Sequence, residues 1–386
     1  MKKIFIFAGE ASGDLHGSHL ISQLSKDFKI EGVGGPRMRK EPFECLIPME
    51  KFQSMGLIDV LKSLPRLFQL FNKVKHLILK KQPACLILID YPGFNLRLAR
   101  HLRKKGYKGK IVQYICPTVW AHGKERIDVL DQYFDLLLTV YPFEASLFEN
   151  KKIQVQYTGN PLAESIHTHA YQSDWREKIG IPVREPFIAL FPGSRPGEIS
   201  KNLCIQLNVA AELKKRHPSL LFALSCGQDG LHEQIMKIAN KNPLQLNQDL
   251  FIVPSTHHYN LMKDCTTALA KSGTVTLELA LHHVPTIVQY ELPGINYLFA
   301  KYWLKLDLPH YCMVNILKNQ TLFPEFIGKN INQDTIVNAL EKLHFDALER
   351  ARVVQGCQEL TEELCVENPY AKAAEAIKNL IMDKQI

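Results

Sequence analysis

The sequence has no uninterrupted apolar run of the ~18–20 residues that a membrane-spanning helix requires. It also has no Cys-x-x-Cys pair, and its nine cysteines are scattered, mostly within apolar segments. This pattern argues against a disulfide framework and a paired-cysteine zinc site, and it indicates a reducing compartment, the cytoplasm. Charged residues form no dense block of one sign, so the net charge of +8 predicts an anionic partner without specifying phosphate, membrane surface or nucleic acid.

The glycine-rich loop near the N-terminus lacks the spacing of a dinucleotide site. Gly9–Gly17 reads GEASGDLHG, which is Gly-x-x-x-Gly-x-x-x-Gly and not Gly-x-Gly-x-x-Gly. The apolar run before it, Ile4–Ala8, is shorter than the ~7–15 residues of a signal-peptide core and is followed by Glu10 and Asp14. We therefore expect a first β-strand there, followed by a loop that holds something other than a dinucleotide.

Apolar runs of strand length alternate with helical patterns throughout, which is typical of parallel α/β architecture. The expected strands are 3–8, 29–33, 84–90, 110–115, 135–140 and 153–157 in the first half, and 186–191, 220–225, 250–253, 266–270 and 285–289 in the second. The alternation restarts after Thr158–Leu162. We predict an α/β fold of two Rossmann-like doubly wound domains, 1–160 and 161–360, facing across a cleft. A last helical segment, 361–386, is expected to cross back to the first domain.

Two loops in the second half have the composition of anion sites. Gly193, Ser194 and Arg195 follow an apolar strand and precede a helix that is expected to begin near Pro196, where free backbone N–H groups and a guanidinium would meet. Ser272, Gly273 and Thr274 again lead from a strand into a helix, with Glu278 one turn inside it. Tight turns and Ser or Thr helix caps are the alternative explanation. Two such loops in one domain favour nucleotide binding.

Five motifs together resemble those of a known family. GEASGD (9–14), DYPGFN (90–95), ICPTVWA (115–121), PGSR (192–195) and SGT (272–274) occur in the order in which bacterial lipid-A-disaccharide synthases carry them. The resemblance covers nearly the whole chain and implies a two-Rossmann (GT-B) glycosyltransferase. It also implies a reaction in which UDP-2,3-diacylglucosamine and 2,3-diacylglucosamine 1-phosphate give lipid A disaccharide 1-phosphate and UDP.

In such an enzyme the second domain holds the UDP-sugar and the first holds the acceptor. The residues implied for the donor are Gly193, Ser194, Arg195, Ser272, Gly273, Thr274, Glu278 and Asn296, and those implied for the acceptor are Glu10, Ser12, Gly13 and Trp120. Asn315 and Glu325 also fall where the resemblance places donor contacts. The segment before Asn315, PHYCMV, departs from the family pattern and leaves its role open.

Inverting glycosyl transfer needs a base for the acceptor hydroxyl and a means to stabilise the departing diphosphate. The chain contains no Asp-x-Asp, so helix N-termini and Arg195 are expected to stabilise the diphosphate, with no essential metal and no cofactor. For the base we favour Asp90, which ends an apolar strand, and Asn95 is a possible cap for the helix after it. His16 and Asp14 are the alternatives, and His257–His258 and His282–His283 are expected to be structural or at the surface.

Both implied substrates carry acyl chains, so a membrane contact is expected. Residues 54–81 combine apolar side chains at helical spacing with cations, among them Lys62, Arg66, Lys73, Lys80 and Lys81, and Pro65 should kink or split the helix. Ordinary packing on the sheet is the alternative for this helix. We expect peripheral association with the cytoplasmic face of the inner membrane and no nucleic-acid partner, and a homodimer is one option for the assembly.

Two other interpretations stay open. One is another GT-B enzyme of UDP-sugars, either a UDP-N-acetylglucosamine 2-epimerase or a transferase acting on the peptidoglycan precursor. An epimerase should bring several acidic residues and histidines to the sugar. The other is a non-catalytic UDP-sugar-binding protein, which would have no reason to place Asp90 beside the UDP-sugar residues.

Overall fold

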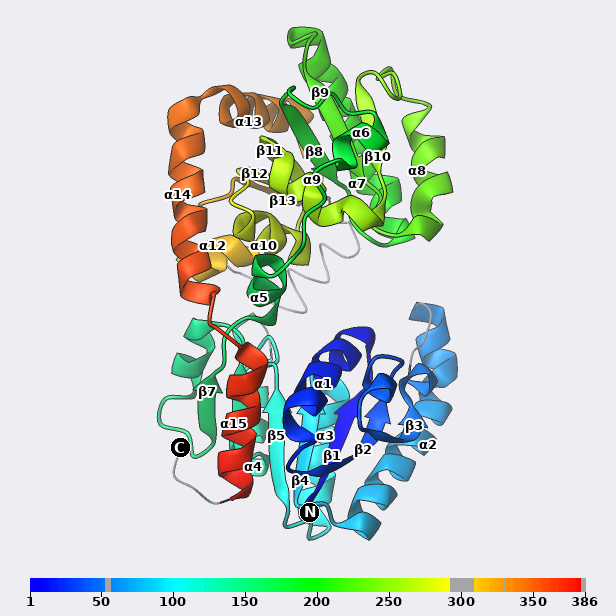
Figure 1. The fold of residues 1–386 in the computed structure, drawn as a ribbon, viewed down its shortest axis with the longest axis vertical. Helices are drawn as coiled ribbons and strands as arrows, with labels where there is room; N and C mark the ends of the chain where they lie inside the picture. Colours follow the sequence, from blue (N-terminus) through cyan, green and yellow to red (C-terminus); the bar gives the residue numbers. More distant parts are fainter. Residues whose placement is uncertain (53–56, 122, 292–308, 329–330, 383–386) are drawn as a thin grey trace. The chain divides into compact units, whose positions relative to one another are not determined.

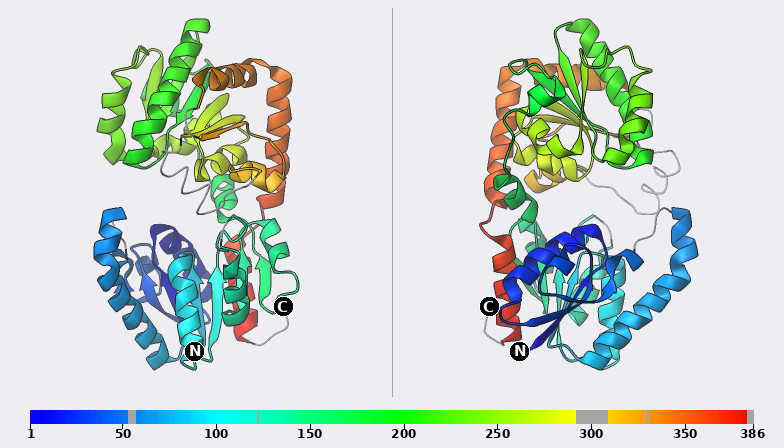
Figure 2. Two further views of the ribbon diagram at one scale, coloured as in Figure 1. Left: turned by 180° about the vertical axis from the view of Figure 1, so that it is seen from behind. Right: turned by 45° about the vertical axis from the view of Figure 1, so that its right-hand side comes forward.

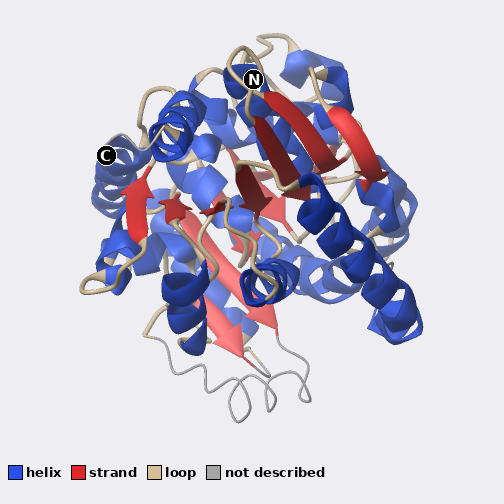
Figure 3. Ribbon diagram, turned by 90° about the horizontal axis from the view of Figure 1, so that it is seen from below, coloured by secondary structure: helices blue, strands red, loops and turns tan. Residues whose placement is uncertain are grey.

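The computed structural model describes residues 1–52, 57–121, 123–291, 309–328 and 331–382, with only the backbone for 57–64 and 229. The chain divides into two units, the first formed by Met1–Pro161 with Val366–Ile386 and the second by Leu162–Cys365 (Figure 1). The end of the chain thus lies in the unit in which the chain begins. Each unit is an α/β sandwich, with helices on the faces of a parallel sheet (Figure 3).

The sheet of the first unit has seven strands in its described residues, all parallel, in the order β3-β2-β1-β4-β5-β6-β7. The strands are β1 (Lys3–Ala8), β2 (Lys29–Gly34), β3 (Glu44–Pro48), β4 (Cys85–Ile89), β5 (Lys110–Tyr114), β6 (Leu136–Thr139) and β7 (Gln154–Tyr157). Successive residues of β1 enter different cores. Ile4 and Ile6 pack on the α1 side, whereas Phe5 and Phe7 pack on the α2 side. Both faces are therefore buried, which explains the continuous apolar runs.

The sheet of the second unit has six parallel strands in the part of the chain described, in the order β10-β9-β8-β11-β12-β13. They are β8 (Phe187–Phe191), β9 (Leu221–Ser225), β10 (Leu250–Val253), β11 (Thr267–Lys271), β12 (Thr286–Glu291) and β13 (Glu325–Gly328). Strand order reverses between β8 and β11, where ligands of doubly wound sheets bind. The predicted fold class is confirmed. Both strands that the sequence analysis missed, β3 and β13, lie at sheet edges.

The helices of the first unit lie on both faces of its sheet (Figure 2). They are α1 (Ala11–Leu24), α2 (Leu57–Lys81), α3 (Pro92–Lys104), α4 (Glu125–Tyr133) and α15 (Pro369–Ile381). Pro65 lies inside α2, which continues through it from Leu57 to Lys81, so the proline does not split the helix, contrary to one of our expectations. No described helix combines the length and apolar character needed to cross a bilayer.

The helices of the second unit cover its sheet in the same manner. They are α5 (Pro161–His167), α6 (Trp175–Ile179), α7 (Pro196–Arg216), α8 (His232–Ala239), α9 (His258–Asp264), α10 (Thr274–Leu281), α12 (Met313–Lys318), α13 (Gln333–Phe345) and α14 (Ala347–Leu364). The single helical segment expected at 361–386 contains the last turn of α14 and, after a break, the whole of α15. Asn368 has a φ of +51° and Pro369 starts the next helix, so the chain breaks between α14 and α15.

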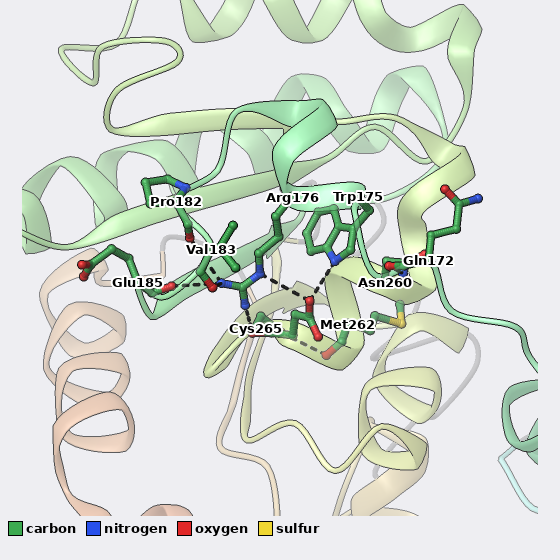
Figure 4. A network of polar contacts seen from close by, with 10 residues as sticks. Gln172, Trp175, Arg176, Pro182, Val183, Glu185, Asn260, Met262 and Cys265 are labelled. Atoms are coloured by element: carbon green, nitrogen blue, oxygen red, sulfur yellow. Dashed lines mark hydrogen bonds and ion pairs between the residues drawn. The ribbon is translucent and has the colours of Figure 1, made fainter.

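An arginine ties the irregular segment at the start of the second unit to its sheet. Arg176 donates from Nη1 to the carbonyls of Val183 (2.9 Å) and Glu185 (3.2 Å), and from Nη2 to the carbonyl of Asp264 (2.9 Å) (Figure 4). The Trp175 indole donates to the Asp264 carboxylate at 2.7 Å. The side chain of Arg176 thus satisfies carbonyls that no regular element would pair, which lets a polar segment lie against the core.

Helix α15 packs against α1 and β5 and completes one core of the first unit. Ile377 is fully buried, and the neighbouring Lys378 forms an ion pair with Asp27 at 2.6 Å. The Lys2 ammonium also donates to the Ile381 carbonyl at 3.0 Å. The C-terminal segment is therefore an integral layer of the first unit.

Replacing Ile377 with alanine should destabilise the first unit by about 2–5 kcal/mol, since a buried branched side chain is lost and a cavity stays behind. Peptide-resolved hydrogen exchange should show faster exchange in α1 and β5, with α7 and β8 of the second unit unchanged. Glu375→Ala, which changes an exposed residue of the same helix, is the control and should leave exchange as in the wild type. Equal acceleration in both units would contradict the assignment of α15 to the first unit alone.

Candidate functional site

The second unit contains a pocket of about 400 Å³ at the carboxyl ends of its central strands. Phe191 ends β8, Ser225 ends β9 and Lys271 ends β11, and all three side chains line the pocket. The first turns of α7 and α10 supply much of the remaining wall. The pocket thus lies where two helix N-termini and the strand-order reversal meet.

One side of this pocket is built for an anion. The Ser194 N–H, the Arg195 guanidinium at the N-cap of α7 and the Lys271 ammonium gather there. Glu198, in the first turn of α7, lies among them. Its Oε2 accepts from the Ser194 N–H at 3.3 Å, and its Oε1 is 3.3 Å from both Arg195 Nη1 and Lys271 Nζ. Lys271 also lies over the Tyr290 ring, 4.6 Å from its centroid.

The other side of the pocket holds a carboxylate in a polar network. Glu278 lies one turn into α10, with its Oε1 3.5 Å from the Tyr259 hydroxyl and its Oε2 3.6 Å from His258 Nε2. His258 Nδ1 is 3.0 Å from the Ser225 hydroxyl. Burial and the Glu278 charge raise the pKa of Tyr259, so its hydroxyl stays protonated and donates to the carboxylate. A carboxylate held in this manner can accept two hydrogen bonds from a diol.

The structure gathers most of the predicted donor-side residues in this pocket. Gly193, Ser194, Arg195, Gly273, Thr274 and Glu278 line it, Ser272 is not among the lining residues, and Asn296 lies outside the described residues. The predicted helix caps do not form, because Gly273 itself is the N-cap of α10 without a side-chain bond. His258 was expected to be structural or at the surface and instead lines the pocket. Sequence reasoning also missed Ser225, Gly227, Ser255 and Lys271.

In the first unit, Asp90 emerges at the carboxyl end of β4 on a strained backbone. Asp90 and Tyr91 have φ angles of +48° and +49°, and Ile115, at the end of the adjacent β5, has +72°. Such angles are costly for residues other than glycine, above all for a β-branched one. Two fully buried amides hold this edge, since Asn95 Nδ2 and Gln113 Nε2 both donate to the Asp90 carbonyl. Asn95 therefore lies inside α3 and braces the turn from there, which differs from the expected cap.

The GEASGD loop lies against Asp90. Ser12 Oγ donates to Asp90 Oδ2 at 3.2 Å. A Cβ at position 9 would come within 2.8 Å of the Tyr91 ring, and one at position 13 within 3.3 Å of the Ala8 Cβ, so both glycines provide room for protein packing. Burial and the Glu10 charge raise the pKa of Tyr91. The loop therefore brings Ser12 into contact with Asp90 at the carboxyl end of β4.

The two alternative bases, Asp14 and His16, are held by other parts of the first unit. The buried Asp14 carboxylate accepts the backbone N–H groups of Gly35 (2.7 Å), Arg37 (2.9 Å) and Met38 (3.1 Å). His16 Nδ1 lies 3.0 Å from the Tyr370 hydroxyl of α15, and burial followed by the His19 charge lowers its pKa to about 4. Three backbone bonds make Asp14 a loop anchor, and His16 is a weak base at neutral pH.

Trp120 lies over a short helical turn, η3 (Pro142–Phe148), that follows β6. Its ring is 6.0 Å from the Phe143 ring at 74°. The next residue, Glu144, is buried, and its Oε2 accepts the N–H groups of Val140 (3.3 Å) and Tyr141 (3.2 Å). Burial raises the pKa of Glu144 to about 8, against the opposing effect of these backbone bonds.

An apolar cavity of about 640 Å³ adjoins the Asp90 edge of the first unit. Its walls come from α2 and from the start of α3, and they include Leu67, Phe68, Phe71, Tyr91 and Phe94. Arg97 and His101 stand at its polar side. The exposed fraction of Phe68 is 68%, so part of this apolar lining faces solvent.

The side chains of Asn315 and Glu325 form hydrogen bonds within the protein. The buried Asn315 amide donates to the Phe323 carbonyl (2.7 Å) and to Glu325 Oε1 (2.6 Å), and it accepts the N–H groups of Leu322 and Phe323. Glu325 in turn accepts the N–H groups of Tyr311 and Cys312 at the start of α12. This gives both residues a structural role. Among the described residues no group of three or more His, Cys, Asp or Glu side chains is arranged to hold a metal ion.

Solved structures with this fold define its class. A putative UDP-N-acetylglucosamine 2-epimerase from Listeria monocytogenes is similar with a TM-score of 0.63 at 12% identity, over 99% of this chain and 97% of that one. Sucrose-phosphate synthase from Thermosynechococcus elongatus is similar with a TM-score of 0.57 at 13% identity, over the whole of both chains. The fold is therefore that of the GT-B glycosyltransferases and the related epimerases.

Sequence similarity then gives the family. The model of the family described as lipid-A-disaccharide synthetase matches residues 4–379. Lipid-A-disaccharide synthase of Chlamydia pneumoniae is 41% identical over 347 residues, which cover 88% of this chain and 56% of that protein. The enzyme of Pseudomonas aeruginosa is 32% identical over 383 residues and 98% of each chain. The chain belongs to the lipid-A-disaccharide synthase family. It spans little more than half the length of the chlamydial relatives.

The buried Glu144 predicts a pH-dependent stability. The folded protein binds the Glu144 proton more tightly than the unfolded chain, so this contribution is complete below pH ~4.5 and is lost as the pH rises through about 8. Glu144→Gln keeps the shape and the accepting oxygen but does not titrate. Between pH 6 and pH 9 the wild type should therefore lose on the order of 2–3 kcal/mol more stability than the variant.

Urea unfolding at the two pH values, followed by tryptophan fluorescence, measures this difference. Glu149→Gln changes an exposed carboxylate just after the same turn, and it should behave as the wild type does. Parallel pH profiles for the wild type and Glu144→Gln would contradict a protonated Glu144.

Proposed function

We propose that the protein is an inverting glycosyltransferase that joins UDP-2,3-diacylglucosamine to 2,3-diacylglucosamine 1-phosphate, giving lipid A disaccharide 1-phosphate and UDP. The observation that carries the proposal is the family match over residues 4–379. The GT-B fold alone would be compatible with many reactions of nucleotide sugars. In this proposal the second unit binds the donor and the first unit binds the acceptor.

The pocket of the second unit has the chemistry that a UDP-sugar requires. The Ser194 N–H, Arg195 and Lys271 can bind the diphosphate and stabilise the charge that develops on it as it leaves. Glu278, oriented by Tyr259 and His258, can accept the ribose hydroxyls. Because these groups supply cations and N–H donors without a metal ligand set, we propose a metal-independent transfer.

Asp90 is the proposed general base. Its carboxylate takes the proton of the acceptor 6-hydroxyl while that oxygen attacks the anomeric carbon, and the bond from this carbon to the diphosphate oxygen breaks with its electrons leaving on UDP. Ser12 donates to Asp90 Oδ2, which fixes the carboxylate and leaves Oδ1 for the substrate. The bracing of the Asp90 carbonyl by Asn95 and Gln113 supports this role, because strained backbone collects at functional positions. Glu10 and Trp120 are proposed acceptor contacts.

The apolar cavity beside Tyr91 and Phe94 is the proposed site for an acyl chain of the acceptor. It adjoins the Asp90 turn, and it opens along α2, where Arg66, Lys73 and Lys80 are exposed. Exposed apolar side chains flanked by cations favour contact with an anionic bilayer surface. We therefore propose peripheral association with the cytoplasmic face of the inner membrane. The homodimer stays a prediction.

The alternative functions explain fewer features of this protein than the proposed glycosyltransferase activity does. An epimerase or a peptidoglycan-precursor transferase shares the fold, but the similarity to these solved epimerases is 11–13% in identity and concerns the fold only. A non-catalytic UDP-sugar-binding protein would need the pocket of the second unit and would not need the strained Asp90 edge.

The proposal is tested by measuring UDP release from UDP-2,3-diacylglucosamine in detergent, with and without 2,3-diacylglucosamine 1-phosphate and with EDTA. Release that requires the acceptor and persists in EDTA is the expected result. Release without acceptor would indicate a hydrolase, and release abolished by EDTA would contradict the metal-independent mechanism. If the protein binds UDP but forms none from UDP-2,3-diacylglucosamine, only the nucleotide-binding part of the proposal is supported.

Asp90→Asn should lower turnover roughly 10²–10⁴-fold, the range expected for a lost general base, while UDP affinity stays unchanged. Asparagine is the suitable replacement because it tolerates the positive φ at this position better than alanine does. Asp128→Asn, at an exposed carboxylate of α4, is the matched control and should turn over as the wild type does. Near-normal turnover of Asp90→Asn would transfer the role of base to another group.

A further inference from the structure

Glu198 occupies a position that is unexpected in a site for a diphosphate. Its carboxylate lies within 3.3 Å of the Arg195 guanidinium, the Lys271 ammonium and the Ser194 N–H, the three groups that give the pocket its affinity for anions. The side chains of Glu198 and Lys271 are 14% and 15% exposed, so this contact is shielded from water and only weakly screened by salt. An incoming diphosphate therefore meets cations that already have an anionic partner.

The loop is shaped to admit this carboxylate. Gly193 has a φ of +118°, and a Cβ at this position would come within 2.7 Å of Glu198 Oε2. Glycine is therefore required both for the backbone conformation and for the room that the carboxylate takes. Residues 193–198 thus provide both an anion site and the carboxylate, that of Glu198, which occupies it.

Each cation is also placed by a feature other than Glu198. Lys271 lies over the Tyr290 ring at 4.6 Å, a contact that does not involve the carboxylate. Arg195 is the N-cap residue of α7, and its side chain is 80% exposed with Glu198 as an ion-pair partner three residues away. Removing the negative charge of Glu198 should therefore leave both cations in place, with no anion between them.

We infer that Glu198 is an internal counter-ion that fills the diphosphate site of the empty protein and competes with the nucleotide. This inference rests on the proposed function, since it assigns a diphosphate to this pocket. Bound UDP leaves Glu198 as a like charge beside the phosphates, which weakens product binding and speeds its release. Glu198 is thus a determinant of product release and takes no part in the chemical step.

The test is the affinity of Glu198→Gln for UDP, UMP and uridine, measured by calorimetry. Glutamine keeps the size of the side chain and removes the charge. UDP should bind roughly five- to tenfold more tightly, because one like charge at close range is lost, and its dissociation rate should fall to a similar extent. The gain should be smaller for UMP and absent for uridine, which has no phosphate. Glu198→Ala removes the carboxylate without leaving an amide, and UDP should again bind more tightly.

Glu212→Gln is the matched control, since it removes one negative charge from the same helix at a distance from the pocket and should leave UDP affinity unchanged. Weaker UDP binding by both Glu198 variants would show that the carboxylate positions the cations, and would overturn the inference. Unchanged UDP binding, or an equal gain for uridine, would overturn it as well. A wild type that binds no UDP would overturn the proposed function along with it, whereas wild-type binding without tighter binding by the variants overturns the inference alone.

Discussion

The burial of each parallel sheet on both faces determines where chemistry can occur in this protein. Every residue of β4 and β8 is buried, so the interior of these strands admits only apolar side chains. Polar side chains can therefore reach a ligand only at the ends of these strands. Asp90 follows β4, Ser225 ends β9 and Lys271 ends β11, so each candidate site has polar groups at such ends. The same constraint that gives each unit its core therefore collects its functional groups at one edge.

Different interactions hold the carboxyl-end edges of the two sheets in place. In the first unit, the buried amides of Asn95 and Gln113 hold a backbone with positive φ at Asp90, which costs conformational energy and fixes the position of the proposed base. In the second unit, charge–charge contacts between Glu198, Arg195 and Lys271 satisfy the site before any ligand arrives. A rigid position suits proton transfer, where geometry is limiting, whereas exchangeable ion pairs suit a group that binds and leaves in every turnover.

The central strands could be predicted because uninterrupted apolar runs such as Cys85–Ile89 are typical of strands buried on both faces. The edge strands β3 and β13 could not, since they are half-exposed and carry little apolar pattern. Arg195 and Glu278 follow from motifs at strand-to-helix turns. Lys271 and His258 carry no such signal, because only the register of β11 and the direction of α9 bring them to the pocket. Likewise, nothing local shows that the Asp14 carboxylate is used by the backbone around Gly35.

The return of α15 to the first unit also determines the order in which the protein is completed on the ribosome. The strands of the first unit emerge before residue 161, but the helix that covers α1 and β5 emerges only after the whole second unit has been made. Throughout that interval Leu20, Ile21 and Val112, which share a core with Ile377, lack one of their covering layers. The second unit is continuous in sequence and can fold at once, whereas the first must wait for its second segment, Val366–Ile386.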